Sequence, residues 1–283
     1  MAEFTNKATL TVGGVSIDSN TVSGTREGTT ELTKTALLPT YGDGPVTYVV
    51  SFVNNGTTDV TGLSLTDDLG AYAFGGQTLW PLEYIADSLM IYISGVEQPV
   101  VVPKALQPFE VTVPTVPAGG NLLMVYAASP TAYAPRGEGQ TVTNTVTAAS
   151  PDLSASMEAA ADVAPAQNAD LSLSKSVDPQ ELVEGEPVTY TIVALNSGAA
   201  AVAQTDGLVI SDTLDPALAG LTVTLDGEPR AEGTGYTYDV STGAFATVAG
   251  VVTVPAATFA QDPTTGVWSA SPGAATLRIT GTV

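Results

Sequence analysis

Residues 31–70 read ELTKTALLPTYGDGPVTYVVSFVNNGTTDVTGLSLTDDLG, and residues 171–215 read LSLSKSVDPQELVEGEPVTYTIVALNSGAAAVAQTDGLVISDTLD. Both contain the motif Pro-Val-Thr-Tyr, at residues 45–48 and 187–190. Further on, LMIYISG from Leu89 resembles LTVTLDG from Leu221. Internal similarity of this kind indicates that one structural unit occurs twice in the chain.

Each copy alternates apolar and polar residues with a period of two, which is typical of β-strands with one buried face. The chain has 283 residues, of which 44% are hydrophobic and only 6% aromatic, with 28 glycines and 19 prolines. This mixture suits many short strands joined by turns, and the length suits two domains. Residues 154–164 are rich in alanine but are interpreted as strand and linker. Asn55-Gly56 and Asp226-Gly227 are predicted to be hairpin turns.

The composition excludes several classes of function. Eight basic against 29 acidic residues give a net charge of −21, which repels phosphate backbones and argues against nucleic-acid binding. Without cysteine or histidine there are no disulfides, thiol nucleophiles, usual zinc sites or Ser-His-Asp triad. No cofactor is expected. No apolar stretch is long enough to span a bilayer, and MAEFTNKATL contains no recognisable signal peptide, so export requires a removed leader or another route.

The repeat is offset from the ends of the chain. The first copy continues through residues 142–147, VTNTVT, whereas the second copy has no downstream counterpart. The counterpart is at the other end of the chain, at residues 4–9, FTNKAT. We therefore predict that the second sandwich is one strand short and exposes an unpaired edge with apolar core residues.

The N-terminal segment fits this gap. Phe4, Ala8, Leu10 and Val12 share one face of an extended strand, as donor residues for strand addition to a neighbouring copy. Because the contact is head to tail, its repetition produces a filament. The alternative is that residues 4–22 form a hairpin on their own domain, turning at Gly13-Gly14.

The combined pattern L-x-K, P-V-T-Y, N-x-G, S-D-T-L and V-T-N resembles the bacterial conserved-repeat family known as domain of unknown function eleven. The resemblance covers both copies. It implies immunoglobulin-like sandwiches at the bacterial cell surface or outside the cell, in stalks, fibres and adhesins rather than enzymes. The expected fold class is all-β, with an N-terminal donor strand or hairpin at residues 1–28, one sandwich at 29–165, and a second at 166–283 that lacks its closing strand.

Each copy also directs charged and amide side chains to the apolar face. Strand parity places Lys34, Asp67 and Asn144 on the same strand faces as inward leucines and valines. Their equivalents are Lys175, Asp212 and Asn6, respectively. Because an apolar setting disfavours both ionised forms, the lysine tends toward a neutral amine and the aspartate toward a protonated acid.

These sets resemble the Lys-Asp/Glu-Asn isopeptide cross-links of Gram-positive pilin and collagen-adhesin domains. The resemblance implies that Lys34 joins Asn144 with assistance from Asp67. It likewise implies that Lys175 joins Asn6 of the next subunit with assistance from Asp212. Two other interpretations remain open, an unreacted hydrogen-bond network and lysines that extend to water. Asp68 replaces Asp67 if the register slips by one residue.

The function predicted from the sequence is a structural subunit of an extracellular bacterial fibre, a homopolymer whose external ligand is unknown. The alternative is a spacer, stalk or adhesin fragment of a larger surface protein. A glycosidase fits poorly because no acidic pair is marked by its surroundings. Aspartate-rich turns such as Asp212–Asp215 are interpreted as turn caps rather than as calcium sites.

Overall fold

The computed structural model describes residues 2–12, 14–26, 30–42, 44–99, 101–181 and 183–283, and the chain divides into two compact units. The first consists chiefly of residues up to Pro165, and the second chiefly of those from Ala166 onward. The described residues form an all-β structure whose single helical element is the 3-10 turn Gln204–Asp206. No helix among them is long and apolar enough to cross a bilayer.

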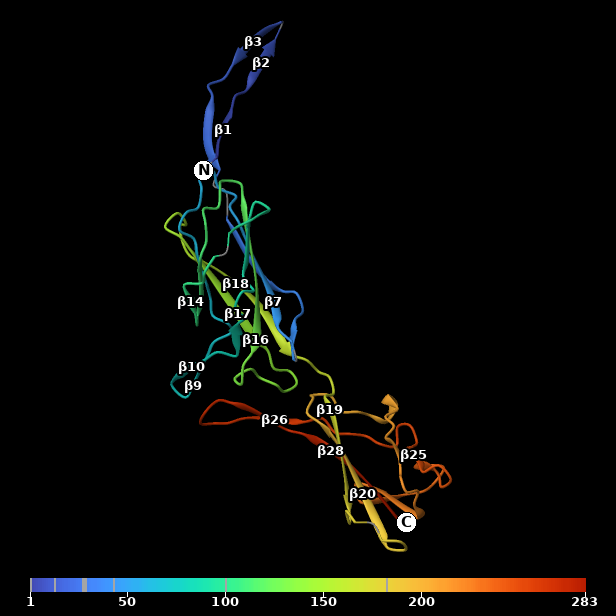
Figure 1. Ribbon diagram of the computed structural model, residues 1–283. Coiled ribbons are helices and arrows are strands. Elements are labelled where there is room, and N and C mark those ends of the chain that lie inside the picture. Colours follow the sequence, from blue (N-terminus) through green and yellow to red (C-terminus); the bar gives the residue numbers. More distant parts are fainter. Residues whose placement is uncertain (1, 13, 27–29, 43, 100, 182) are drawn as a thin grey trace. The chain divides into compact units, whose positions relative to one another are not determined.

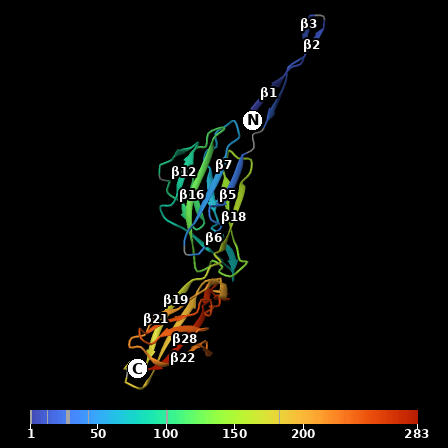
Figure 2. The same cartoon turned by 90° about the vertical axis from the view of Figure 1, so that its right-hand side faces the viewer.

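The first unit contains a sandwich of two six-stranded sheets (Figure 2). One sheet has the order β13-β12-β16-β7-β5, with β11 paired to β16, and the other has the order β14-β15-β8-β17-β18-β6. The strands of the first sheet are β5 (Glu31–Ala36), β7 (Val46–Val53), β11 (Leu82–Tyr84), β12 (Met90–Ile93), β13 (Val96–Glu97) and β16 (Asn121–Pro130). Those of the second are β6 (Thr40–Tyr41), β8 (Ser64–Asp67), β14 (Ala105–Leu106), β15 (Phe109–Thr112), β17 (Val142–Ala149) and β18 (Met157–Pro165). The short pair β9 (Tyr72–Phe74) and β10 (Gln77–Leu79) lies outside both sheets.

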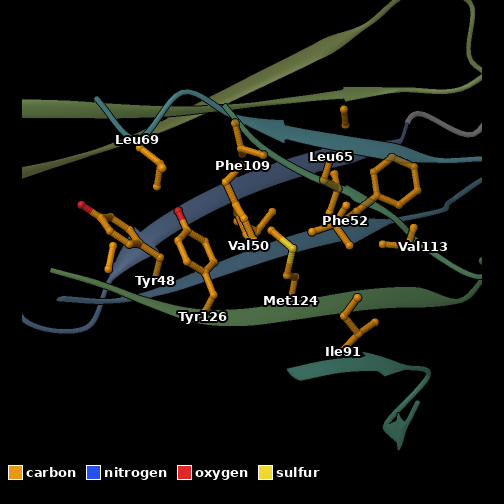
Figure 3. Packing of buried hydrophobic residues seen from close by; sticks show 14 of the residues in the cluster. Tyr48, Val50, Phe52, Leu65, Leu69, Ile91, Phe109, Val113, Met124 and Tyr126 are labelled. Carbon is orange, nitrogen blue, oxygen red and sulfur yellow. The ribbon is translucent and has the colours of Figure 1, made fainter. Parts of the chain in front are cut away.

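The core lies between these two sheets, because alternate residues of each strand are buried. Strand β7 has the burial pattern of a strict alternation, with Val46, Tyr48, Val50 and Phe52 inside. Figure 3 shows Tyr48 beside Tyr126 with both hydroxyls at the same end of the core, and the two rings stack with centroids 5.3 Å apart.

The second unit has a five-stranded sheet in the order β19-β20-β28-β22-β23 and a three-stranded sheet in the order β21-β25-β24. Their strands are β19 (Leu171–Asp178), β20 (Pro187–Asn196), β21 (Ser211–Thr213), β22 (Ala219–Leu225), β23 (Glu228–Arg230), β24 (Tyr236–Asp239), β25 (Ala244–Thr247) and β28 (Gly273–Thr282). A separate hairpin joins β26 (Thr258–Gln261) to β27 (Trp268–Ser271).

The registers of the two units match strand by strand. Lys34 of β5 pairs with Val50, as Lys175 of β19 pairs with Ile192. In the second sheets, Asp67 of β8 pairs with Phe109 of β15, as Asp212 of β21 pairs with Phe245 of β25. The structural repeat therefore follows the sequence repeat. Among the described residues, the two sheets of the second unit hold eight strands against twelve in the first, and they lack counterparts of β6, β11, β17 and β18. The sequence predicts the absence of one strand, the counterpart of β17.

The repeated Asn-x-Gly motif is structural. The Asn54 amide donates hydrogen bonds to the carbonyls of Thr58, Val116 and Pro117, and its oxygen accepts one from the Gly56 amide. The prediction of a hairpin turn at Asn55-Gly56 is wrong, because β7 pairs with β5 and β16 and the chain then crosses to the other sheet. Asp226 and Gly227, both at positive φ, do join the paired strands β22 and β23.

The N-terminal segment forms a ribbon that we call the N-terminal hairpin. It consists of β1 (Ala2–Asn6), β2 (Thr9–Val12), β3 (Val15–Asp18) and β4 (Val22–Arg26), with β1 paired to β4 and β2 paired to β3 (Figure 1). Within the described residues these strands pair only with one another.

Candidate functional site

A buried ion pair lies in the core of the first unit. The Nζ atom of Lys34 on β5 is 2.6 Å from Oδ2 of Asp67 on β8, and neither side chain is accessible to solvent. The Lys34 ammonium also lies 4.8 Å from the centre of the Tyr48 ring. Asp68 points elsewhere, since its Oδ1 accepts hydrogen bonds from the Gly70 and Thr145 amides. Of the two neighbouring aspartates, Asp67 is therefore the one that contacts the lysine.

Tyr126 connects this pair to Asn144. Its hydroxyl donates to Oδ2 of Asp67 at 2.6 Å and accepts from Nδ2 of Asn144 at 3.1 Å. Asn144 is fully buried, and its Oδ1 has no hydrogen-bond partner among the described residues. The sequence reasoning missed Tyr126. A signal was present, because Tyr126 falls on the inward face of its strand and a buried tyrosine hydroxyl needs a partner.

Burial controls the protonation of the pair. Desolvation lowers the pKa of Lys34, although Asp67 opposes the shift, and desolvation raises the pKa of Asp67 against the opposing effect of Lys34. Both shifts favour the neutral amine and the protonated acid. A neutral amine is a nucleophile, and an acid beside it can move a proton.

The network contains the groups that an isopeptide bond requires. In that reaction the Lys34 Nζ attacks Cγ of Asn144, the bond from Cγ to Nδ2 breaks, and ammonia leaves with the proton that the lysine loses. Asp67 is placed to transfer that proton, and the unpaired Asn144 oxygen is the atom that an acid would polarise. The same contacts also describe an unreacted network, so the bond itself remains a prediction.

The tyrosine bridge gives a direct test. We expect Tyr126→Phe to lower the free energy of unfolding by about 1–3 kcal/mol, because a buried amide loses its acceptor. We also expect slower loss of ammonia, because Asn144 is no longer oriented. Thermal unfolding and intact mass measured over time check both effects. Tyr92→Phe is the control, since among the described residues the Tyr92 hydroxyl forms its one hydrogen bond to the Met90 sulfur at 3.7 Å. Equal behaviour of the two variants would contradict the role of the bridge.

The second unit repeats this arrangement in an open form. Nζ of Lys175 is 2.5 Å from Oδ2 of Asp212 and 4.5 Å from the centre of the Tyr190 ring. The Lys175 side chain is 40% exposed and that of Asp212 is 16% exposed. Ile279 occupies the register position of Tyr126, because it pairs with Tyr190 as Tyr126 pairs with Tyr48.

An apolar groove lies beside this pair. Strand β19 has almost no buried residue, whereas β5, its counterpart in the first unit, buries Lys34 and half-buries Leu32. Leu173 is 63% exposed. The groove has a volume of about 260 Å³ and is lined chiefly by apolar side chains, namely Leu171, Leu173, Ala194, Leu208, Val209 and Ile210.

The corresponding surface of the first unit is covered by β17 and β18. Strand β17 pairs with β8, with Val146 opposite Asp67 and Ala148 opposite Leu65. Strand β18 pairs with β17 in turn, with Ala161 opposite Asn144. The free side of β21 and the exposed face of β19 are therefore the positions that two further strands would occupy.

The N-terminal hairpin has one polar and one apolar face. On the polar face Asp18 accepts hydrogen bonds from Lys7 at 2.6 Å and from Thr9 at 2.7 Å. The opposite face carries exposed Leu10 directly across from exposed Ile17. Asn6 lies across from exposed Val22 where β1 pairs with β4. Among the other donor residues, Ala8 is exposed, and the side chains of Phe4 and Val12 lie outside the described part of the structure.

The hairpin also corresponds to β17 and β18 in the order of the chain. Strand β4 leads into β5, as β18 leads into β19. Asn6 pairs with Val22 across the hairpin, as Asn144 pairs with Ala161. No three acidic side chains gather as a metal site among the described residues.

The chain resembles solved structures only distantly. No family model matches the sequence, so the resemblance to the conserved-repeat family has no further support, and no curated protein matches it. The similar solved structures include major pilins and a collagen-binding subdomain, and also parts of a Vibrio harveyi glycosidase.

Three of these matches can be compared by coverage. The major pilin subunit BcpA of Bacillus cereus has a TM-score of 0.37 at 11% identity, over 96% of this chain and 73% of that chain. The C-terminal fragment of the major pilin GBS80 of Streptococcus agalactiae has 0.33 at 11%, over 78% and 79%. The collagen-binding subdomain of the Enterococcus faecalis surface protein ACE has 0.31 at 12%, over 47% and 94%. Likeness at this level assigns no function, so the functional argument rests on the residues of this chain.

Proposed function

We propose that the chain is a structural subunit of an extracellular bacterial fibre, in which the N-terminal hairpin of one copy completes the second unit of the next. The observation that carries the proposal is the contrast between β5 and β19. The same strand is covered where β17 and β18 are present and uncovered where they are absent. The extracellular location rests on the resemblance of the repeat motif.

The registers support a specific fit. If the hairpin pairs with β21 as β17 pairs with β8, Ala8 lies opposite Asp212 and Leu10 opposite Ile210. Asn6 then lies where Asn144 lies in the first unit, beside Lys175 and Asp212. The contact is between different surfaces of the two copies, and its repetition gives a filament unless the rotation closes a ring.

The fit also supplies a driving force for assembly that opposes the electrostatic repulsion between copies. Each copy carries a net charge of −21, so assembly must overcome repulsion. Burial of Leu10, Ile17 and Val22 contributes roughly 5–9 kcal/mol before the cost of ordering, at about 1.5–3 kcal/mol for each side chain. Pairing of the open β21 edge adds main-chain hydrogen bonds.

Covalent bonds complete the proposal. Lys34 joins Asn144 within each first unit with assistance from Asp67. Lys175 joins Asn6 of the neighbouring copy with assistance from Asp212. The first bond braces one sandwich, and the second locks successive copies together.

Removal of residues 1–26 tests the polymer. We expect the full chain to form fibres under the electron microscope, and the shortened chain to remain monomeric because it accepts but cannot donate. When the shortened chain is added to fibres of the full chain, it should bind only at the fibre end that exposes a donor hairpin. Fibres of the shortened chain would overturn the proposal. A full chain that stays monomeric at high concentration would favour the spacer or adhesin fragment instead.

A further inference from the structure

We propose that Leu10 and Ala194 form a size-matched pair that makes the N-terminal hairpin specific for the second unit. This inference rests on the proposed function and deepens it, since it names the residues that select the correct acceptor. At the same strand positions of the first unit, the relative sizes of the two residues are reversed. There the sheet carries a large residue at this position and the closing strand carries a small one.

In the first unit the large residue is Phe52. It is fully buried on β7 and lies across from Leu32 on one side and from Leu122 on the other. Figure 3 shows its ring among the buried side chains of this core, together with Leu65. Leu65 is the residue that pairs with Ala148 of the closing strand β17, and Ala148 is also fully buried.

In the second unit the corresponding row is smaller. Ala194 occupies the position of Phe52, because it pairs with Leu173 on one side and Ala275 on the other. Ala194 and Ala275 therefore occupy the positions that Phe52 and Leu122 hold in the first unit. Ala194 lines the groove of about 260 Å³. Since a water molecule takes about 30 Å³ of the liquid, this groove has room for several waters, which an apolar side chain would displace.

The donor strand is larger at the matching position. Alignment of residues 4–9 with residues 142–147 sets Leu10 at the place of Ala148. Leu10 is 64% exposed, opposite Ile17 on the apolar face of the hairpin. In the β17 register it lies across from Ile210, which lines the same groove as Ala194.

The exchange of sizes has a consequence for specificity. Leu10 in the place of Ala148 would enlarge a fully buried position in the core that already holds Phe52, and so overpack that core, whereas an alanine in the second groove would leave a cavity. The hairpin therefore favours the second unit, and the resident strand β17 favours the first. Discrimination of this kind combines a good fit with a clash against the wrong partner.

A double-variant cycle in the full chain tests the pair. Ala194→Phe fills the groove, and we expect it to raise the protein concentration needed for fibre growth by at least about tenfold. Leu10→Ala leaves a cavity and should raise that concentration by a similar factor. The combination of Leu10→Ala with Ala194→Phe recreates the Phe52 and Ala148 arrangement, and should return growth to within about threefold of the original chain.

Growth is measured by light scattering and fibres by electron microscopy. Thermal unfolding of the Ala194→Phe chain shows that it folds, and Phe52 demonstrates that this position of the sandwich holds a phenylalanine. If the original chain polymerises but Ala194→Phe has no effect, or Leu10→Ala fails to rescue folded Ala194→Phe, the size-matched pair is wrong and the fibre proposal stands. If the original chain does not polymerise, both proposals fail.

Discussion

We expect Lys34→Met to destabilise the first unit by about 3–5 kcal/mol relative to the parent chain before its Lys34–Asn144 bond forms, because it removes the cation that partners buried Asp67. The same substitution at Lys175 should cost an isolated chain less than about 1 kcal/mol, because that side chain is 40% exposed and its ion pair is screened by solvent. Denaturant unfolding of chains that lack residues 1–26 compares the two variants without polymerisation.

The loss at Lys34→Met depends on pH in a defined direction. Burial raises the pKa of Asp67 in the folded state, and removal of the lysine removes the main opposing effect. The folded variant therefore holds a proton that the unfolded chain releases above about pH 4. Since the folded state binds more protons, stability falls as the pH rises from that value. The parent chain should lose much less over the same range.

In fibres the roles of the two lysines reverse. Lys175→Met and Asn6→Ala should each abolish the ladder that survives boiling in denaturing electrophoresis, while each chain still loses one ammonia through Lys34 and Asn144. Lys34→Met should keep the ladder and lose the internal mass change. Lys34→Met combined with Asp67→Leu is the control for charge, and should recover much of the lost stability. A ladder unaffected by Asn6→Ala would show that another bond joins the subunits.

The inward side chains of the site followed from strand parity. Lys34, Asp67 and Asn144 lie on three different strands, and a period of two was enough to direct each toward the core. Parity cannot show which residues meet across the two sheets. Tyr126 was missed for that reason, since its role depends on the position of Asp67 and Asn144 in the facing sheet.

The fold was predictable where the repeat is clear and less so elsewhere. The repeat predicted the missing counterpart of β17, but not that of β18, because residues 157–165 and 15–26 share a strand pattern rather than letters. The β26–β27 hairpin has no equivalent in the first copy of the repeat, so comparison of the two copies did not predict it. At Asn55-Gly56 the dipeptide suggested a tight turn, but the Asn54 side chain fixes a longer crossing between sheets.

The largest change in assembly is expected from a chain that completes itself. A copy of residues 2–26 is appended after Val283 through a copy of residues 131–141, the connection that joins β16 to β17 in the first unit. Because the donor is then tethered, its effective concentration is on the order of millimolar, and the groove closes within the chain. We expect a monomer that forms no fibres, although its original hairpin is still present.

The same chain should also gain stability in its second unit. Closure buries Leu173 and the appended copies of Leu10, Ile17 and Val22, which we expect to raise the free energy of unfolding of that unit by roughly 5 kcal/mol after ordering costs. The control carries aspartate in place of Leu10 and Ile17 in the appended copy only, so that it has the same length and tether but cannot fill an apolar groove. That control should still form fibres. Fibres from the self-completed chain, or a control as monomeric as the test chain, would mean that the groove accepts something other than the apolar face of the hairpin.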